Sequence, residues 1–85
     1  MNEQDIQQHA INLSNWVPVQ ELPVEYPQFT YSQVKTLFWK RDRILGLNRC
    51  VRMAGKRMYV CRPLFGAWLA GLLPEQRMQM RGDNS

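Results

Sequence analysis

Near the middle of the chain, apolar residues recur with the period of an α-helix. Val34, Leu37 and Phe38 stand at i, i+3 and i+4, so they share one side of a helix, and that side should face the core. Thr30 precedes the pattern and is a good N-cap, because its hydroxyl can accept a first-turn N–H that would otherwise lack a partner. We expect the helix to end near residues 42–43.

The opposite side of this helix is polar and basic. A rotation of about 100° per residue gathers there Ser32, Thr36, Trp39 and Arg43, flanked by Gln33, Lys35 and Lys40. These residue types suit a helix that lies along an acidic groove, but the solvated face of an ordinary amphipathic helix carries them as well. For this helix taken alone, the solvated face is the better interpretation.

Residues 50–61 alternate instead with the period of a β-strand. Gly55 and Lys56 fit a two-residue turn of type II′, which takes glycine at its first position. The predicted cross-strand pairs are Ala54–Arg57, Met53–Met58, Arg52–Tyr59, Val51–Val60 and Cys50–Cys61. One face of this hairpin is then apolar, whereas the other face and the tip are basic.

Prolines divide the segment before the central helix. We expect residues 16–27 to start extended and then to form a brief helix, with Pro18 at the first helical position, where a missing N–H costs little. Pro23 should prevent a long helix and push Leu22 away from the α conformation, and Pro27 closes the segment. A brief helix, a tight turn and a capped helix outline a helix-turn-helix.

The folded region should end with a helix that begins at Pro63 and stops at Pro74. The apolar stripe of this helix, which closes the core, consists of Leu64, Phe65, Trp68, Leu69 and Leu72. Residues 44–48 read as a loop with apolar plugs, in which Gly46 and Asn48 can adopt left-handed backbone conformations.

The chain therefore divides into an N-terminal arm (residues 1–15), one domain (16–73) and a flexible tail (74–85). The arm is either a short helix or a frayed segment. The fold class of the domain should be α+β: a small winged helix-turn-helix with two short helices, a basic β-hairpin as the wing and a C-terminal helix. A domain of this size buries only about 60% of its unfolded surface, so its stability should be marginal.

Positive charge is concentrated in one part of the chain. The net charge of the 85 residues is +4, but residues 35–62 alone hold nine Lys or Arg and a single acid, Asp42. A block of this density suits a polyanion such as nucleic acid. An acidic membrane surface or a requirement for solubility would favour a similar block.

The sequence offers little for catalysis or for metal binding. Cys50 and Cys61 are too few for a disulfide scaffold and lack CxxC spacing, so we expect free structural thiols. With His9 in the arm, neither a zinc site nor a catalytic set can be assembled, and we expect no enzyme activity and no cofactor. No segment approaches the roughly 18 apolar residues of a membrane span, so the expected location is cytoplasmic, in association with the nucleoid.

The order of these elements resembles the small excisionases of phages and integrated elements. These proteins are also called recombination directionality factors and share a MerR-like winged-helix fold. The similarity covers about 55 of the 85 residues and is carried by Val17-Pro18-Val19-Gln20-Glu21-Leu22, Tyr26-Pro27, Thr30 to Phe38, Gly46-Leu47, Val51-Arg52-Met53-Ala54-Gly55-Lys56-Arg57-Met58-Tyr59-Val60 and Phe65-Gly66-Ala67-Trp68-Leu69. Pro23 in the first helix departs from the family pattern and puts the geometry of that helix in doubt.

The resemblance implies a protein that binds and bends attachment-site DNA and directs a tyrosine-type integrase toward excision. The DNA-binding residues would be Thr30, Tyr31, Ser32, Gln33, Lys35, Thr36, Trp39, Lys40, Arg43, Arg52, Lys56 and Arg57. The central helix would enter the major groove, with hydroxyl, amide and guanidinium groups toward the base edges and its lysines toward phosphates. The hairpin tip would reach the neighbouring minor groove. Trp39 would pack either on the sugar-phosphate backbone or on Leu45 or Leu47, and we favour the second.

Two other functions remain open. A small transcriptional regulator of the same fold would show the same sequence features. A protein-interaction module whose basic face meets an acidic partner is the second alternative. Several copies binding side by side on DNA would help to bend it, because bending by tens of degrees costs on the order of 1–6 kcal/mol.

Overall fold

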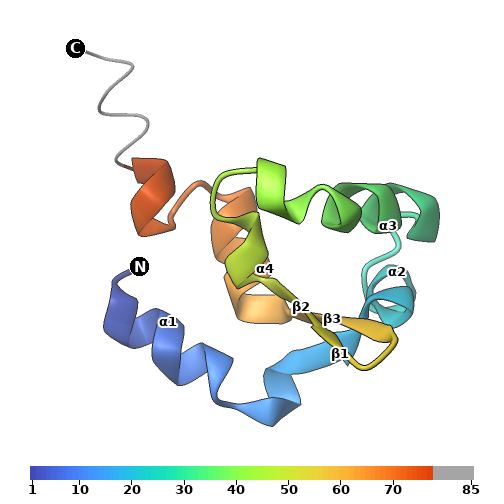
Figure 1. Ribbon diagram of the computed structural model, residues 1–85, viewed down its shortest axis with the longest axis horizontal. Coiled ribbons are helices and arrows are strands. Elements are labelled where there is room, and N and C mark those ends of the chain that lie inside the picture. Colours follow the sequence, from blue (N-terminus) through green and yellow to red (C-terminus); the bar gives the residue numbers. More distant parts are fainter. Residues whose placement is uncertain (78–85) are drawn as a thin grey trace.

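A computed structural model of the chain describes residues 1–77 and has the α+β architecture expected from the sequence (Figure 1). Its elements, in chain order, are α1 (Glu3–Ala10), the 3-10 helix η1 (Leu13–Asn15), β1 (Trp16–Pro18), the 3-10 helix η2 (Val19–Glu21), α2 (Leu22–Glu25), α3 (Tyr31–Trp39), the 3-10 helices η3 (Arg41–Arg43) and η4 (Leu47–Arg49), β2 (Val51–Ala54), β3 (Arg57–Cys61) and α4 (Arg62–Leu69).

The hairpin forms with the predicted register. β2 pairs antiparallel with β3 so that Val51 lies opposite Val60 and Ala54 opposite Arg57. Gly55 has φ +67°, and Lys56 is not among the residues with positive φ, as a type II′ turn requires. Val51 and Val60 are fully buried, so the apolar face of the hairpin is the one that meets the core.

The sheet has a third strand that the hydropathy pattern did not predict to pair. β1 lies on the other side of β3, giving the order β1-β3-β2, with Trp16 opposite Cys61 and Pro18 opposite Tyr59. The prediction that Pro18 opens a helix was wrong, because Pro18 ends this edge strand, where a residue without an N–H is tolerated.

The core lies between the sheet, α3 and α4, and Phe65 of α4 stands near its centre. The ring of Phe65 meets Phe38 of α3 edge-on at a centroid distance of 5.2 Å and stacks on Trp68 at 5.8 Å. Phe29, in the connection before α3, approaches Phe65 at 5.7 Å. Val34 and Phe38 are buried and Leu37 is partly buried, which confirms the predicted core-facing side of the central helix.

Helical structure before α3 is more continuous than the prolines suggested. η2 runs directly into α2, and Leu22 has φ −58° and ψ −46°, so the expectation that Pro23 would exclude it from the α conformation was wrong. Pro23 stands in the first turn of α2, where its missing N–H has no intrahelical acceptor to lose.

α3 is shorter than predicted. It ends at Trp39, because Lys40 leaves the helical conformation and the Arg41 guanidinium donates to the Phe38 carbonyl at 3.0 Å. Arg43 was predicted to lie on the polar side of the central helix, but it belongs to η3 and so lies beyond the end of α3. Gly46, with φ +82°, then turns the chain so that Leu47 enters the core. Asn48 does not adopt the left-handed conformation that was expected as an option.

α4 also ends early, which corrects the predicted apolar stripe. Gly71 adopts φ +76°, while the Leu72 N–H bonds the Ala67 carbonyl and the Gly71 N–H bonds the Trp68 carbonyl, which is a Schellman motif. The chain turns away at this point. As a result, Leu69 and Leu72 are 60% and 47% exposed, whereas Leu73, which was not assigned to the stripe, is fully buried.

The two ends of the described chain lie on the same side of the molecule (Figure 1). α1 begins at an Asn2 cap, contacts α4 and buries Ile6, so the helical alternative for the arm holds for Glu3–Ala10. Residues 74–77 are helical, whereas the flexible tail was predicted to start at 74; the rest of that predicted tail lies outside the described residues.

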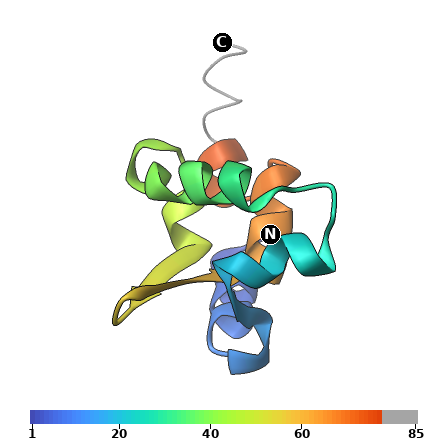
Figure 2. The same cartoon turned by 90° about the vertical axis from the view of Figure 1, so that its right-hand side faces the viewer.

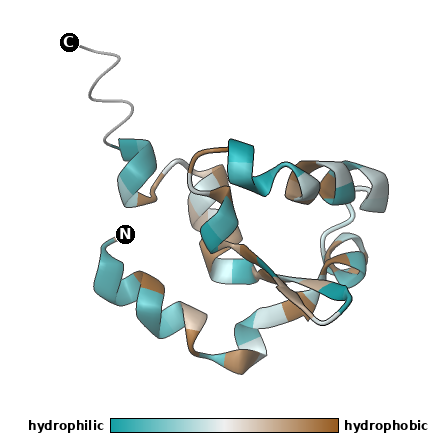
Figure 3. Cartoon of the chain, in the orientation of Figure 1, coloured by the Kyte–Doolittle hydropathy of each residue, from teal (hydrophilic) through white to brown (hydrophobic). Residues whose placement is uncertain are grey.

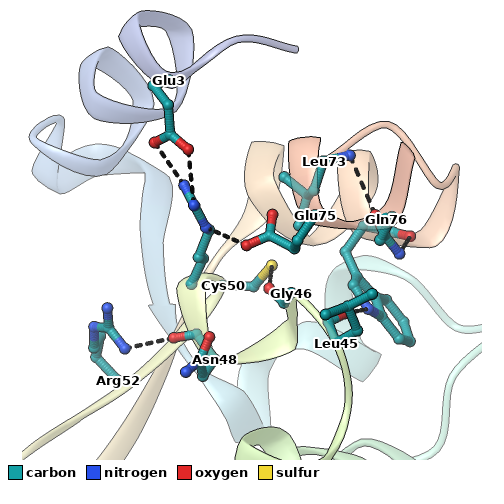
Figure 4. A network of polar contacts seen from close by, with 11 residues as sticks. Glu3, Leu45, Gly46, Asn48, Cys50, Arg52, Leu73, Glu75 and Gln76 are labelled. Carbon is teal, nitrogen blue, oxygen red and sulfur yellow. Dashed lines mark hydrogen bonds and ion pairs between the residues drawn. The ribbon is translucent and has the colours of Figure 1, made fainter. Parts of the chain in front are cut away.

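One arginine joins these two ends (Figure 4). Arg49 of η4 donates to both carboxylate oxygens of Glu3 at 2.8 Å and to Glu75 at 2.7 Å. These contacts hold α1 and the turn at 74–77 against the same loop.

Cys50 and Cys61 are both free and fully buried, as expected for structural thiols. The Cys61 N–H donates to the Cys50 carbonyl at 2.7 Å, so the two residues continue the hairpin register. Each thiol faces a backbone carbonyl at 3.8 Å, that of Gly46 for Cys50 and that of His9 for Cys61.

Candidate nucleic-acid interface

α3 exposes two different rows of side chains. Tyr31, Lys35 and Trp39, spaced by four residues, lie on the side that faces the hairpin. Ser32, Thr36 and Lys40 lie with Gln33 on a second, shallower surface that continues to Ile44. The candidate residues of α3 therefore divide between two neighbouring surfaces.

A groove separates α3 from the hairpin, and we call it the hairpin groove. Its volume is about 230 Å³, and it is lined by Tyr31, Lys35 and Trp39 from α3, by Met53, Lys56, Arg57 and Met58 from the hairpin, and by Pro18, Val19 and Gln20 from β1 and η2. Figure 2 shows the hairpin extending from the body of the molecule below α3. A small-molecule site normally encloses about 300–1,000 Å³, so this open groove suits an extended ligand better.

Three cations and no acid line the hairpin groove. The side chains of Lys35, Lys56 and Arg57 form no hydrogen bond or ion pair with any residue in 1–77. The Lys35 ammonium lies 5.8 Å from the centre of the Tyr31 ring, a cation–π contact that leaves its N–H donors free for an anion. The hairpin tip appears as a hydrophilic end of the sheet in Figure 3.

Carboxylates among residues 1–77 pair with two of the nine cations in the basic block. Arg49 pairs with Glu3 and Glu75, and Arg62 donates to Glu25 at 2.6 Å and to the Ser14 carbonyl at 2.8 Å. These pairings hold segments of the chain together, so their charges belong to the fold. Sequence reasoning missed them because the partners lie 26 to 46 residues away.

The first turn of α3 uses two of the candidate residues for itself. The Gln33 N–H donates to the Thr30 hydroxyl, and the Thr30 N–H donates to Gln33 Oε1, each at 3.1 Å. This capping box satisfies two backbone donors of the helix start. The Thr30 hydroxyl is thus already engaged, whereas the Gln33 amide N–H₂ group has no partner among the described residues.

Arg52 does not join the other candidate residues. It lies beside Leu13, Trp16 and Tyr59, and its guanidinium donates to the Asn48 carbonyl. Arg52 was expected on the same side of the hairpin as Lys56 and Arg57. The register does put it on the pleat face of Arg57, which lies opposite Ala54, but Arg52 lines a different hollow from the two cations of the tip.

Trp39 is 58% exposed and forms part of the wall of the hairpin groove. We had favoured packing of Trp39 on Leu45 or Leu47, but Trp39 lines the hairpin groove and neither leucine does. Met53 and Met58 belong to the apolar face of the hairpin. Met58 packs against the core as that face should, whereas Met53 is exposed, and both line the same groove as Trp39.

Within residues 1–77, no three His, Cys, Asp or Glu side chains lie close enough together to hold a metal ion. Burial raises the pKa of the Cys50 thiol to about 12, so the reactive thiolate form is disfavoured. None of the described helices is long and apolar enough to cross a membrane.

Comparisons of the chain with protein-family models, with curated proteins and with solved structures found no significant match. The function is therefore argued from the geometry of α3 and the hairpin.

Proposed function

We propose that this chain binds double-stranded DNA through a winged helix-turn-helix in which α2 and α3 are the two helices and the hairpin is the wing. The observation that carries the proposal is the set of unpaired cations on α3 and the hairpin tip. Lys35, Lys40, Lys56 and Arg57 are all exposed and have no carboxylate partner within residues 1–77. Cations at this density bind a polyphosphate backbone by releasing its counterions.

The exposed residues of α3 supply the chemistry for reading bases. Ser32, Gln33 and Thr36 carry hydroxyl and amide groups that hydrogen-bond base edges in the major groove, and Lys40 beside them reaches a phosphate. Arg43 of η3 is exposed and would add a further phosphate contact. Lys56 and Arg57 at the hairpin tip contact the adjacent minor groove or its phosphates.

The biological role that fits this interface best is that of an excisionase. In this role, the protein bends attachment-site DNA and sets a tyrosine-type integrase toward excision, with several copies bound side by side. The support is the resemblance in element order and motif, together with an interface built only from binding groups. A small transcriptional regulator of the same fold would use the same surface and differs only in its DNA site.

A second candidate, a module that binds another protein, is favoured by one observation. Tyr26, Phe29, Phe65 and Leu69 line a largely apolar groove between α2 and α4, which shares no residue with the hairpin groove. Exposed apolar grooves of this kind accept side chains from protein partners. Such a site is compatible with DNA binding on the other surface.

A salt titration of binding to random-sequence duplex DNA tests the proposal. We expect weak binding whose log Kd rises linearly with log salt concentration, because each neutralised phosphate contributes a slope of about 0.9. The Lys35→Ala/Lys40→Ala and Lys56→Ala/Arg57→Ala proteins should each lower this slope by up to about 1.8.

Arg77→Ala is the matched control, since it removes an exposed positive charge from the turn at 74–77, far from the hairpin tip. Its slope should equal that of the wild type. If the folded wild-type protein fails to bind DNA at low salt, the DNA-binding function is wrong and the protein-partner function takes its place.

A further inference from the structure

We propose that the hairpin groove holds one deoxyribose-phosphate strand of the duplex and selects DNA over RNA. This inference rests on the proposed function. A helix in the major groove and a hairpin in the next minor groove lie on either side of the strand that separates the two grooves. The groove between α3 and the hairpin is the place that this strand would occupy.

The charged groups of the groove are placed for phosphates. Lys35 comes from α3, while Lys56 and Arg57 come from the hairpin, so cations stand on both walls of the groove. No acid interrupts the lining, and the three side chains are exposed. A strand lying between them would meet positive charge from either side.

Besides the cations and the polar Gln20 and Tyr31, the groove has an apolar stretch that phosphate binding does not require. Trp39 and Met53 are 58% and 41% exposed, and Met58 is half-buried beside them. Exposed apolar groups between cations cost solvation and give nothing to a phosphate. They do match the sugar that links two phosphates, since the C2′ and C5′ methylenes of deoxyribose are apolar.

The same lining disfavours ribose. The 2′-hydroxyl of RNA would replace a C2′ hydrogen that faces the indole and the thioethers, and these groups offer no strong hydrogen-bond acceptor. Removing a hydroxyl from water without a partner is costly. A ribose that lies against Trp39 and Met53 therefore leaves its extra hydroxyl unpaired, and this hydroxyl is the group that separates RNA from DNA at a protein surface.

The test uses the full chain and fluorescence anisotropy with a labelled DNA duplex, comparing wild type, Trp39→Ala, Met53→Ala and the double variant. The matched control is Leu45→Ala, an apolar residue that is 46% exposed and lies outside the groove. We expect Trp39→Ala to weaken DNA binding about fivefold at every salt concentration while leaving the salt slope unchanged, because apolar contact is not screened by ions. Leu45→Ala should bind like the wild type.

A second duplex of the same sequence, with isolated ribonucleotides spaced along both strands, tests the selection. Wild type should bind it more weakly than DNA, and the Trp39→Ala/Met53→Ala protein should lose most of this preference. A preference based on helix shape would persist in the variant and would overturn the inference, as would unchanged affinity of both single variants. Failure of the wild type to bind any DNA is a separate outcome that rejects the proposed function itself.

Discussion

At the scale of single residues, the two thiols show how the core sets chemical reactivity. Burial is the main reason that the pKa of Cys50 rises to about 12, and the nearby Cys61 thiol adds to the shift. Burial likewise raises the pKa of Cys61. A thiolate is the reactive form of cysteine, so both side chains behave as small apolar groups in the folded protein.

We predict that neither thiol reacts with Ellman's reagent at pH 8 in the folded protein, whereas both react at once in denaturant. Since the folded pKa lies above the value of about 8.5 in an unfolded chain, the neutral thiols stabilise the fold below that pH. This contribution is lost as the pH rises toward 12. Urea unfolding should therefore show a decline in the free energy of unfolding above about pH 9.

The Cys50→Ala/Cys61→Ala protein is the control, because the part of the alkaline decline due to the thiols must disappear in it. Rapid modification of the folded wild type at pH 8 would mean that the core opens far more often than fully buried cysteines imply.

At the scale of elements, the segments with local determinants were predictable. The hairpin register follows from Gly55 and the alternation around it, and α3 follows from Thr30 and a 3.6-residue apolar period. β1 could not be predicted to pair, because its partner, β3, lies more than 40 residues away in sequence. The C-terminal ends of α3 and α4 were predicted too late in the chain for a related reason. Each helix stops early so that a later residue, Leu47 or Leu73, can pack in the core, and the apolar period of a helix does not reveal such a long-range contact.

The candidate site divides in the same way. Its α3 residues and the hairpin tip were found from sequence, since period and turn type are local properties. The hairpin groove was not found, because it exists only where α3, η2 and the hairpin meet. The alternation of the strand predicts that Met53 is buried like Val51. Met53 is exposed instead, because the hairpin extends beyond the core that buries Val51.

Thr30 provides a prediction for the start of α3. The Thr30→Ala protein should lose about 1 kcal/mol of stability, measured by urea denaturation, because the Gln33 N–H loses its acceptor. Thr30→Ser keeps the hydroxyl and should stay close to the wild type. If Thr30→Ala retains full stability but binds DNA more weakly, the hydroxyl contacts DNA and is not primarily a cap.

At the scale of the whole molecule, the positive charges divide into those that hold the fold together and those that are free to bind. Arg49 belongs to the first kind, because its guanidinium joins α1 to the turn at 74–77 (Figure 4). The hydrogen bond from Arg49 lowers the pKa of Glu3, so this carboxylate stabilises the fold above its unfolded pKa and loses that effect as the pH falls through the folded value. Lys56 and Arg57 belong to the second kind.

We predict that Arg49→Met changes the stability but not the DNA binding, and that Lys56→Ala/Arg57→Ala changes the DNA binding but not the stability. Arg49→Met should lower the free energy of unfolding by about 1–2 kcal/mol, because it leaves the Glu75 carboxylate, which is only 24% exposed, without its cation. It should leave the salt slope of DNA binding unchanged, since Arg49 is already neutralised. The hairpin variant should keep its stability and lose slope. If Arg49→Met lowered the slope as much as the hairpin variant does, DNA would also contact the loop at Arg49, and the division between charges that hold the fold and charges that bind would be wrong.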